Sequence, residues 1–297
     1  MISPFQQLID KKGSVCWLTS FPKSGNTWFR CFISALFEGE IDINKINTQG
    51  IFSNRPLFDG IFDIDGRLLN EEEVKLRMAD VYRYSAKFSE RMEWIKVHDA
   101  YSLDRKKKPI FPKSVTHKVV YLVRNPLDVV ASYANHNAST IDHAIQMMIN
   151  KNGYLAIQKD GLNMNNQFPQ LMYSWAGHVN SWLDQDELPV ILVRYEDMKL
   201  KGPQTFYRTM KDMEFKFTKK EIQAAIDLSN FDRLKKAEKK EGFKEKNIKS
   251  ESFFRKGKTG AWVNELTKEQ AQIIIDNFGE TMKRLKYKIP NLDKVYK

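Results

Sequence analysis

Short apolar runs alternate with amphipathic segments along this chain. Nearly continuous runs cover residues 15–20, 118–124 and 188–194, and a shorter run covers residues 94–98. Runs of this length and composition are typical of strands that are buried on both faces of a parallel sheet. Because helical patterns separate the runs, the sequence predicts an α/β fold in which helices flank a parallel β-sheet on both faces.

Capping residues mark several helix starts. The pairs with the spacing of a capping box are Asn70 with Glu73, Thr218 with Glu221, and Thr267 with Gln270. The predicted helices cover residues 27–37, 70–84, 126–133, 140–150, 169–184, 202–213, 218–228 and 267–285. Residues 38–69 are expected to form irregular loops, and the charged residues 235–250 are expected to be mobile because they have few apolar positions to bury.

The composition suits one soluble domain. Of the 297 residues, 42% are hydrophobic, which is enough for a sizeable core. No stretch rich in Pro, Gly or Ser divides the chain, so residues 1–297 are expected to form a single domain. The N-terminus lacks the pattern of a secretion signal, and no apolar run reaches membrane-spanning length. We therefore expect a cytoplasmic protein whose two cysteines, Cys16 and Cys31, pack in the core.

A formal net charge of +11 predicts an anionic partner. The partner could be a multiply charged nucleotide, nucleic acid or an anionic membrane surface. Much of the excess charge lies in residues 105–108 and 235–249, and no motif that reads RNA or DNA accompanies these tracts. Nucleic-acid binding is therefore the less favoured interpretation.

The segment between the first apolar run and the first predicted helix has the form of an anion-binding loop. Pro22 and Gly25 punctuate it, and Lys23 adds a positive charge. A strand, a tight loop and a helix N-terminus direct successive backbone N–H groups at one point, which suits a phosphate group. The triphosphate-binding P-loop differs, because its Lys follows the second Gly, whereas Lys23 precedes Gly25.

The order Pro22-Lys23-Ser24-Gly25-Asn26-Thr27-Trp28 resembles the 5′-phosphosulfate-binding loop of the sulfotransferases. These enzymes use 3′-phosphoadenosine 5′-phosphosulfate (PAPS) to sulfate hydroxyl or amine groups, and they release adenosine 3′,5′-bisphosphate (PAP). The resemblance implies a P-loop-like fold. It also implies that the 5′-phosphosulfate is held by Lys23, by the backbone N–H groups of residues 24–27, and by the hydroxyls of Ser24 and Thr27.

A second phosphate site is indicated where the run 118–124 ends. An ATP-dependent kinase usually needs an Asp at a buried strand end to hold Mg²⁺, but this strand ends in Arg124. Arg124 and Ser132, which follows on the predicted helix, can converge on one phosphate. Residues 121–133 resemble the 3′-phosphate-binding motif of the sulfotransferases, in which Arg124 and Ser132 match the phosphate-binding pair. The structural alternative for Arg124 is an ion pair with a helix or loop residue, for example Asp128.

Residues 253–262 resemble the late sulfotransferase motif that closes over the 3′-phosphate. Its phosphate-binding residues correspond to Arg255, Lys256 and Gly257, and two adjacent cations beside a Gly suit the capture of a dianion. Ala261 replaces an Asp of the family motif, which puts the ordering of this loop in question.

The adenosine part of the nucleotide is assigned by resemblance alone. Tyr195 lies in a Tyr-Glu-Asp-Met context that matches a family position in contact with adenosine, and Ser229 and Phe231 match positions that line the adenine pocket. Phe231 could stack on the base, but a core position is an equal alternative.

His98 is the candidate catalytic residue. It ends a short apolar run, and ligands of open α/β sheets bind beyond the carboxyl ends of strands. Lys96-Val97-His98 also resembles the Lys-x-His context of the sulfotransferase general base, although the family often continues with Leu-Pro. The resemblance implies that His98 removes the acceptor proton, that Lys23 and Lys96 neutralise charge, and that no metal is required. The helical spacing around His178 predicts a core residue.

The motifs follow one another in the family order over nearly the whole chain, so the sequence is identified as a member of the PAPS-dependent sulfotransferases. The resemblance implies transfer of a sulfuryl group to a hydroxyl of a small-molecule, lipid or natural-product acceptor. One alternative is a P-loop-type small-molecule kinase that uses ATP and Mg²⁺. The other is a non-enzymatic basic binder of nucleic acid or anionic surfaces.

The acceptor and the assembly are less defined. Phe52, Phe58, Phe62 and Phe168, which lie in or beside the variable loops, indicate an apolar or aromatic acceptor. The start of the chain is more similar to the soluble bacterial branch of the family than to the animal detoxifying enzymes. The sequence does not determine the oligomeric state.

Overall fold

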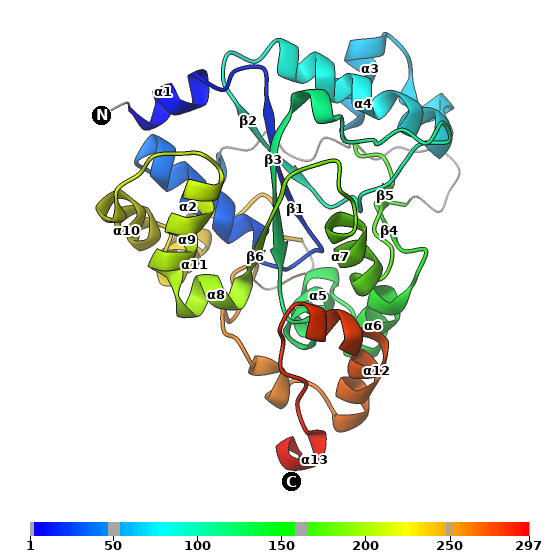
Figure 1. The fold of residues 1–297 in the computed structure, drawn as a ribbon. Coiled ribbons are helices and arrows are strands. Elements are labelled where there is room, and N and C mark those ends of the chain that lie inside the picture. Colours follow the sequence, from blue (N-terminus) through cyan, green and yellow to red (C-terminus); the bar gives the residue numbers. More distant parts are fainter. Residues whose placement is uncertain (1–2, 47–53, 158–165, 248–249, 251, 297) are drawn as a thin grey trace.

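The computed structural model describes residues 3–46, 54–157, 166–247, 250 and 252–296. Its centre is a four-stranded parallel sheet with the order β2-β1-β3-β6 (Figure 1). The strands are β1 (Val15–Ser20), β2 (Glu93–Val97), β3 (Thr116–Val123) and β6 (Val190–Arg194). All four strands predicted from the apolar runs are therefore confirmed, with β1 at its predicted bounds.

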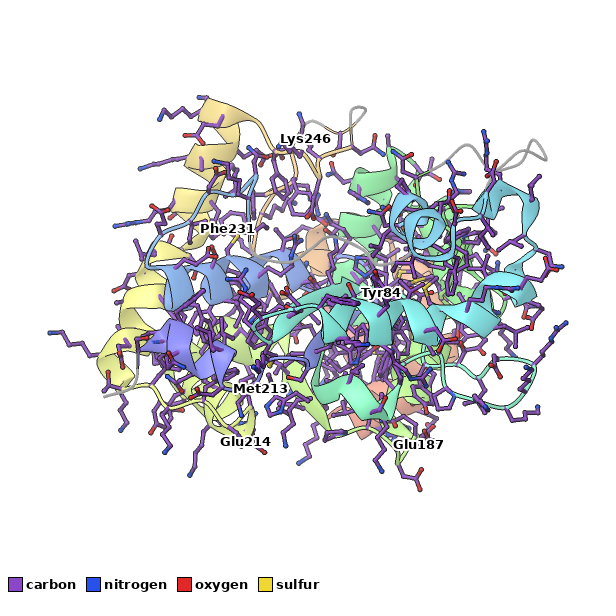
Figure 2. The ribbon with its side chains drawn as sticks, turned by 90° about the horizontal axis from the view of Figure 1, so that it is seen from above. Tyr84, Glu187, Met213, Glu214, Phe231 and Lys246 are labelled. Carbon is purple, nitrogen blue, oxygen red and sulfur yellow. The ribbon has the colours of Figure 1, made fainter. Side chains whose placement is uncertain are left out.

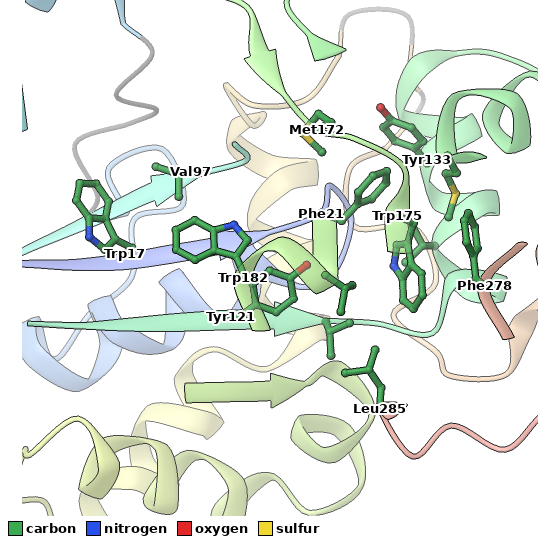
Figure 3. Close-up of a cluster of buried hydrophobic side chains, with 14 of the residues drawn as sticks. Trp17, Phe21, Val97, Tyr121, Tyr133, Met172, Trp175, Trp182, Phe278 and Leu285 are labelled. Carbon is green, nitrogen blue, oxygen red and sulfur yellow. The ribbon is translucent and has the colours of Figure 1, made fainter. Parts of the chain in front are cut away.

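Helices cover both faces of this sheet, as predicted. On one face lie α2 (Asn26–Glu38), α8 (Tyr195–Leu200), α9 (Gly202–Asp212) and α10 (Lys219–Leu228). On the other lie α4 (Glu71–Lys87), α5 (Pro126–Asn137), α6 (Ile141–Ile149), α7 (Trp175–Leu183) and α12 (Lys268–Arg284). Side chains alternate between the faces, so Trp17 and Tyr121 belong to the cluster drawn in Figure 3, whereas Leu18 and Leu122 belong to the opposite one.

Shorter elements complete the described chain. They are α1 (Pro4–Ile9), α3 (Arg55–Phe62), α11 (Phe231–Glu241), α13 (Leu292–Val295), the two-stranded sheet of β4 (Tyr154–Leu155) and β5 (Gln170–Leu171), and the 3₁₀ turns Gly66–Leu68, Lys113–Val115 and Ala261–Asn264. No helix in the ranges that the structure describes is both long enough and apolar enough to cross a bilayer.

The three predicted capping boxes are confirmed. At α4, Asn70 Oδ1 accepts the N–H of Glu73 and the Glu73 carboxylate accepts the N–H of Asn70. The same reciprocal bonds begin α10 and α12. These pairs satisfy N–H groups that the first helical turn leaves without partners, so the starts of these helices can be read from local sequence.

Two predictions of irregular or helical structure are wrong, and a third segment, for which no helix was predicted, contains one. Residues 38–69 contain α3 and a 3₁₀ turn, and α7 begins at Trp175 because Gln170–Leu171 pairs with β4 instead. Residues 235–241 belong to α11, although their composition predicts mobility. The carboxylate of Glu238 on α11 accepts the N–H groups of Phe253 (2.6 Å) and Phe254 (3.0 Å), a contact that apolar spacing does not register.

Candidate active site

A cavity of about 530 Å³ opens beyond the carboxyl ends of the sheet strands. Of the residues predicted for the site, those that line it are Lys23, Gly25, Asn26, Thr27, Trp28, Lys96, His98, Arg124, Ser132, Tyr195, Phe231, Arg255, Lys256 and Gly257. Ser24 and Ser229 do not line the cavity, and both are fully buried beside it. The fold thus brings segments that are far apart in the sequence to one place.

The loop between β1 and α2 has the backbone conformation of an anion-binding turn. Lys23 and Gly25 have φ angles of 66° and 100°, and Gly25 caps α2. A Cβ atom on Gly25 would lie 2.7 Å from the Tyr195 ring, so only glycine fits this close approach. The Asn26 side chain donates to the carbonyl of Leu18 (2.9 Å), which fastens the loop to β1 and leaves the first-turn N–H groups of α2 directed at the cavity.

Two side chains of this loop are held without a conventional partner. The Ser24 hydroxyl is buried and has no hydrogen-bond partner among the described residues. The ammonium group of Lys23 lies 3.8 Å from the centre of the Phe253 ring. Burial, reinforced by the charges of Lys96 and Arg124, lowers the pKa of Lys23 to about 7. An anion in the cavity would relieve both the burial penalty and this repulsion.

Arg124 and Ser132 both line the cavity, as the second motif predicts. Arg124 donates to the carbonyl oxygens of Lys258 (2.9 Å) and Lys23 (3.4 Å), and its guanidinium carbon lies 4.5 Å from the centre of the Tyr195 ring. Among the described residues Arg124 forms no ion pair with Asp128, whose carboxylate accepts two backbone N–H groups instead. Arg124 instead links two loops. One is the loop between β1 and α2, called the phosphate loop after its predicted ligand, and the other is the late loop, residues 253–262.

The late loop is fixed by acidic residues from outside its motif. Glu265 pairs with both Arg255 and Lys256. Asp128, at the start of α5, accepts the N–H groups of Gly260 (2.7 Å) and Trp262 (3.1 Å). Although Ala261 replaces the family's Asp, the carboxylate of Asp128 on α5 therefore holds the backbone of this loop in place.

Aromatic side chains line the part of the cavity that is predicted to bind adenosine. Trp28 and Tyr195 meet edge to face at 5.7 Å, and the Trp28 indole donates to the carbonyl of Ser229 (3.0 Å). Phe231 lines the cavity at the start of α11 and is partly buried. A Cβ atom on Gly257, where φ is 58°, would lie 2.5 Å from the Phe231 ring, so the late loop packs directly on it. Sequence reasoning missed Lys199, which lines this region one helical turn after Tyr195.

His98 follows β2 and is 9% exposed. Its Nδ1 lies 2.7 Å from the carbonyl oxygen of Ser20. Because a carbonyl only accepts, Nδ1 carries the hydrogen and Nε2 keeps an available lone pair. Burial, together with the charge of Lys96, lowers the pKa of His98 to about 3, which keeps the ring neutral. Nε2 has the lone pair that can accept a proton, but the ring is a weak base at this pKa, and a negative charge bound nearby would raise it.

Glu245 is a site residue that the sequence did not reveal. Its carboxylate bridges Arg30 (2.6 Å) on α2 and Lys96 (3.1 Å) on β2, and it lines the cavity. Burial alone would raise the pKa of Glu245, but the two cations outweigh burial and lower it to about 2. No local signal could have found this contact, since Glu245 lies in a segment whose composition predicts mobility.

Three aromatic side chains that the sequence indicated for the acceptor site lie elsewhere. Phe58 and Phe168 are buried in the core, Phe62 packs against that core, and none of the three lines the cavity. Phe52 lies outside the described residues. The wall instead includes Tyr133, His136, Asn137, Leu155, Ala156, Gln167, Gln170, Lys244 and Phe253. Phe58, Phe62 and Phe168 therefore contribute to the core and not to the wall of this cavity.

Comparison with protein-family models finds the sulfotransferase domain over residues 14–286. The chain belongs to the sulfotransferase family. Among curated relatives, Cytosolic sulfotransferase 7 of Arabidopsis thaliana is 23% identical over 276 residues, which cover 91% of this sulfotransferase and 79% of the relative. Cytosolic sulfotransferase 1 of Arabidopsis thaliana is 27% identical over 275 residues, which cover 85% and 73%.

Solved structures show the same fold. A mouse sulfotransferase complexed with PAP is 19% identical with a TM-score of 0.58, and the match covers 94% of this sulfotransferase and 90% of the mouse chain. Retinol dehydratase in a complex with retinol and PAP is 18% identical with a TM-score of 0.59, and the match covers 90% and 82%. The P-loop-like α/β fold is therefore confirmed.

Proposed function

We propose that this sulfotransferase takes its sulfuryl group from PAPS, releases PAP, and sulfates a hydroxyl group of a small-molecule or natural-product acceptor. The main support for the proposal is that residues from four separate segments line the same cavity. They are residues of the phosphate loop, Arg124 with Ser132, residues 255–257, and His98. Two related folds were solved with PAP, and one of them also with retinol, an alcohol. The proposal includes no metal ion, and a cytoplasmic location agrees with the names of the plant relatives.

The residues present fit this nucleotide. The buried Ser24 hydroxyl and the Nε of Arg124 have no hydrogen-bond partner among the described residues, so both can serve a phosphate oxygen. Lys23 and residues 24–27 would hold the 5′ end, and Arg124, Ser132 and residues 255–257 would hold the 3′-phosphate. PAPS supplies the sulfuryl group and a phosphate that leaves with the bonding electron pair.

The chain's own groups would then act on the acceptor and on developing charge. As the hydroxyl oxygen forms its bond to sulfur, Nε2 of His98 takes the hydroxyl proton, while Nδ1 stays hydrogen-bonded to Ser20. Lys23 and Lys96 stabilise the negative charge that develops on the sulfuryl and leaving oxygens. Positioning and charge stabilisation supply most of the catalysis in group transfers of this type.

Thermal unfolding with PAP, in parallel with ATP plus Mg²⁺, tests the nucleotide. A ligand present at about 100 times its dissociation constant adds roughly 2.7 kcal/mol to the free energy of unfolding. Stabilisation by PAP without metal is expected. Stabilisation by ATP and Mg²⁺ alone would favour the kinase alternative, and a response to neither would favour the basic binder, whose lysines lie on and after α11.

The affinity for PAP is expected to fall as the pH rises above about 7. Lys23 has a pKa of about 7 in this structure, and a bound phosphate raises that pKa. Below pH 7 Lys23 is already charged before PAP binds. Above pH 7 Lys23 is neutral and must take up a proton when PAP binds, so the affinity falls by up to about tenfold per pH unit. Calorimetry between pH 7 and 9 in buffers of different ionisation enthalpy measures both the affinity and the proton uptake.

Lys23→Met is the matched variant for this pH dependence. It should bind PAP weakly and with little change between pH 7 and 9. Lys96 and Lys199 also have lowered pKa values because of burial, so an unchanged slope in Lys23→Met would assign the proton uptake to them and contradict the prediction.

Glu245→Gln is expected to bind PAP more tightly and to unfold more easily. In this variant the positive charges of Lys96 and Arg30 are no longer offset by Glu245, so they attract the anionic nucleotide more strongly. The added attraction is about 1 kcal/mol, which corresponds to roughly five- to tenfold in affinity. Loss of one partner of a partly buried network costs about 1–3 kcal/mol of unfolding free energy. The exposed Glu241, which pairs with Lys240, provides Glu241→Gln as a control. Weaker PAP binding by Glu245→Gln would refute the prediction.

A further inference from the structure

The imidazole of His178 is fully buried in α7 and has a hydrogen-bond partner at each ring nitrogen. Its Nδ1 lies 2.7 Å from the hydroxyl of Tyr121 on β3, and its Nε2 lies 3.0 Å from the backbone carbonyl oxygen of His98. The helical spacing predicts a plain core residue at this position. The two polar contacts show that His178 does more than fill space.

These contacts fix the tautomer of His178. The carbonyl of His98 can only accept, so Nε2 of His178 carries the hydrogen and Nδ1 accepts from the Tyr121 hydroxyl. Burial lowers the pKa of His178 to about 4 and raises the pKa of Tyr121, so the imidazole stays neutral and the phenol stays protonated. The chain of donors therefore runs in one direction, from Tyr121 through His178 to the backbone of His98.

The backbone of His98 needs this support because the sheet does not hold it. The register between β1 and β2 ends with the pair Thr19 and Val97, so His98 lies just beyond the last paired residue. From α7, one turn after His178, Trp182 donates its indole N–H to the next carbonyl, that of Asp99 (3.0 Å). Figure 3 shows Tyr121 and Trp182 in the same buried cluster. Two side chains of one helix thus hold two successive carbonyls at the strand end.

We infer that His178 is a positioning residue, which holds the main chain of His98 so that Nε2 of His98 faces the acceptor, with Tyr121 fixing the tautomer of His178. The inference rests on the proposed function of His98 as the proton acceptor. His178 also touches the phosphate loop, because its ring meets Phe21 edge to face at 5.8 Å. The buried side chain of His178 therefore contacts both His98 and Phe21, and it helps to fix the position of His98 relative to the phosphate loop.

The test compares His178→Phe, which keeps a ring but removes the donor, with His178→Gln, whose side-chain N–H can again reach the carbonyl of His98. The control is His117→Phe. His117 Nε2 also lies 3.0 Å from a backbone carbonyl, that of Met213, which Figure 2 shows below Phe231 in that view. The measurements are kcat for PAPS-dependent sulfation of p-nitrophenol, PAP affinity by calorimetry, and histidine-ring ¹⁵N spectra over a pH series, with the His98 signal assigned through His98→Ala.

His178→Phe is expected to lower kcat by about 10- to 100-fold with unchanged PAP affinity, because a misplaced reacting group costs rate rather than nucleotide binding. It should also change the titration of the His98 ring. His178→Gln should recover most of kcat, and His117→Phe should lower the unfolding temperature without changing kcat. Tyr121→Phe, which removes only a hydroxyl, should show mixed tautomers of His178 and gives a readout even if His178→Phe does not fold.

The inference is overturned if His178→Phe folds and retains wild-type kcat and the wild-type His98 spectrum, or if His178→Gln is as impaired as His178→Phe. Failure of the wild-type protein to bind PAP or to sulfate any acceptor would instead contradict the proposed function. The ring spectra do not depend on nucleotide or acceptor, so they would still decide whether His178 fixes His98.

Discussion

Replacement of His98 by alanine is expected to lower kcat by about 10² to 10⁴-fold and to leave the affinity for PAP unchanged. The ring supplies the lone pair that takes the acceptor proton, and Ser20 holds its other nitrogen. No predicted phosphate contact comes from His98, so nucleotide binding should not depend on it. Steady-state sulfation by PAPS and calorimetry with PAP measure the two quantities separately.

His143→Ala provides the control for this experiment. His143 lies exposed on α6, away from the cavity wall, so its loss should affect neither kcat nor PAP affinity. If His98→Ala lost nucleotide affinity to the same degree as it lost kcat, His98 would be a binding or structural residue instead of a proton acceptor.

Replacement of Asp128 by alanine is expected to abolish most of the preference for a 3′-phosphate. Asp128 is 4% exposed and accepts the N–H groups of Gly260 and Trp262, which hold the late loop beside Arg124. The buried N–H of Trp262 and the part-buried N–H of Gly260 would both lose their partner, at about 1–3 kcal/mol for the buried group, so the loop should detach rather than remain in place. The expected loss of PAP affinity is therefore at least about 30-fold.

The matched ligand for this variant is adenosine 5′-monophosphate, which lacks the 3′-phosphate. Its affinity should change little in Asp128→Ala, because the phosphate loop and the aromatic group around Trp28 and Tyr195 stay intact. Asp142, which accepts from Gln270 at the surface, provides Asp142→Ala as a control. Equal losses for PAP and the monophosphate would show global unfolding and contradict the specific role of Asp128.

Much of the fold could be predicted because its signals are local. The buried strands β1 and β3 are continuous apolar runs, and the capping boxes define three helix starts within four residues each. The site residues in the phosphate loop and at the ends of β2 and β3 could also be predicted, because the carboxyl ends of parallel strands meet at one edge of the sheet.

The remaining contacts depend on pairs that are distant in sequence. Glu245 reaches Lys96, Glu238 holds Phe253, and His178 supports His98, yet nothing in the local pattern around any of them indicates its partner. The placement of the loop aromatics could not be predicted for a related reason. An aromatic side chain in a loop can turn toward a cavity or into the core, and Phe58 and Phe168 turn into the core.

Glu245 and Glu265 have a consequence for product release. In this structure each carboxylate neutralises two cations, Arg30 with Lys96 in one case and Arg255 with Lys256 in the other. Under the proposed function, a carboxylate that stays beside a cation would replace a departing phosphate oxygen, and the product would leave one contact at a time. We therefore expect Glu245 and Glu265 to compete with the bound nucleotide for these cations, which would lower its affinity and speed its release.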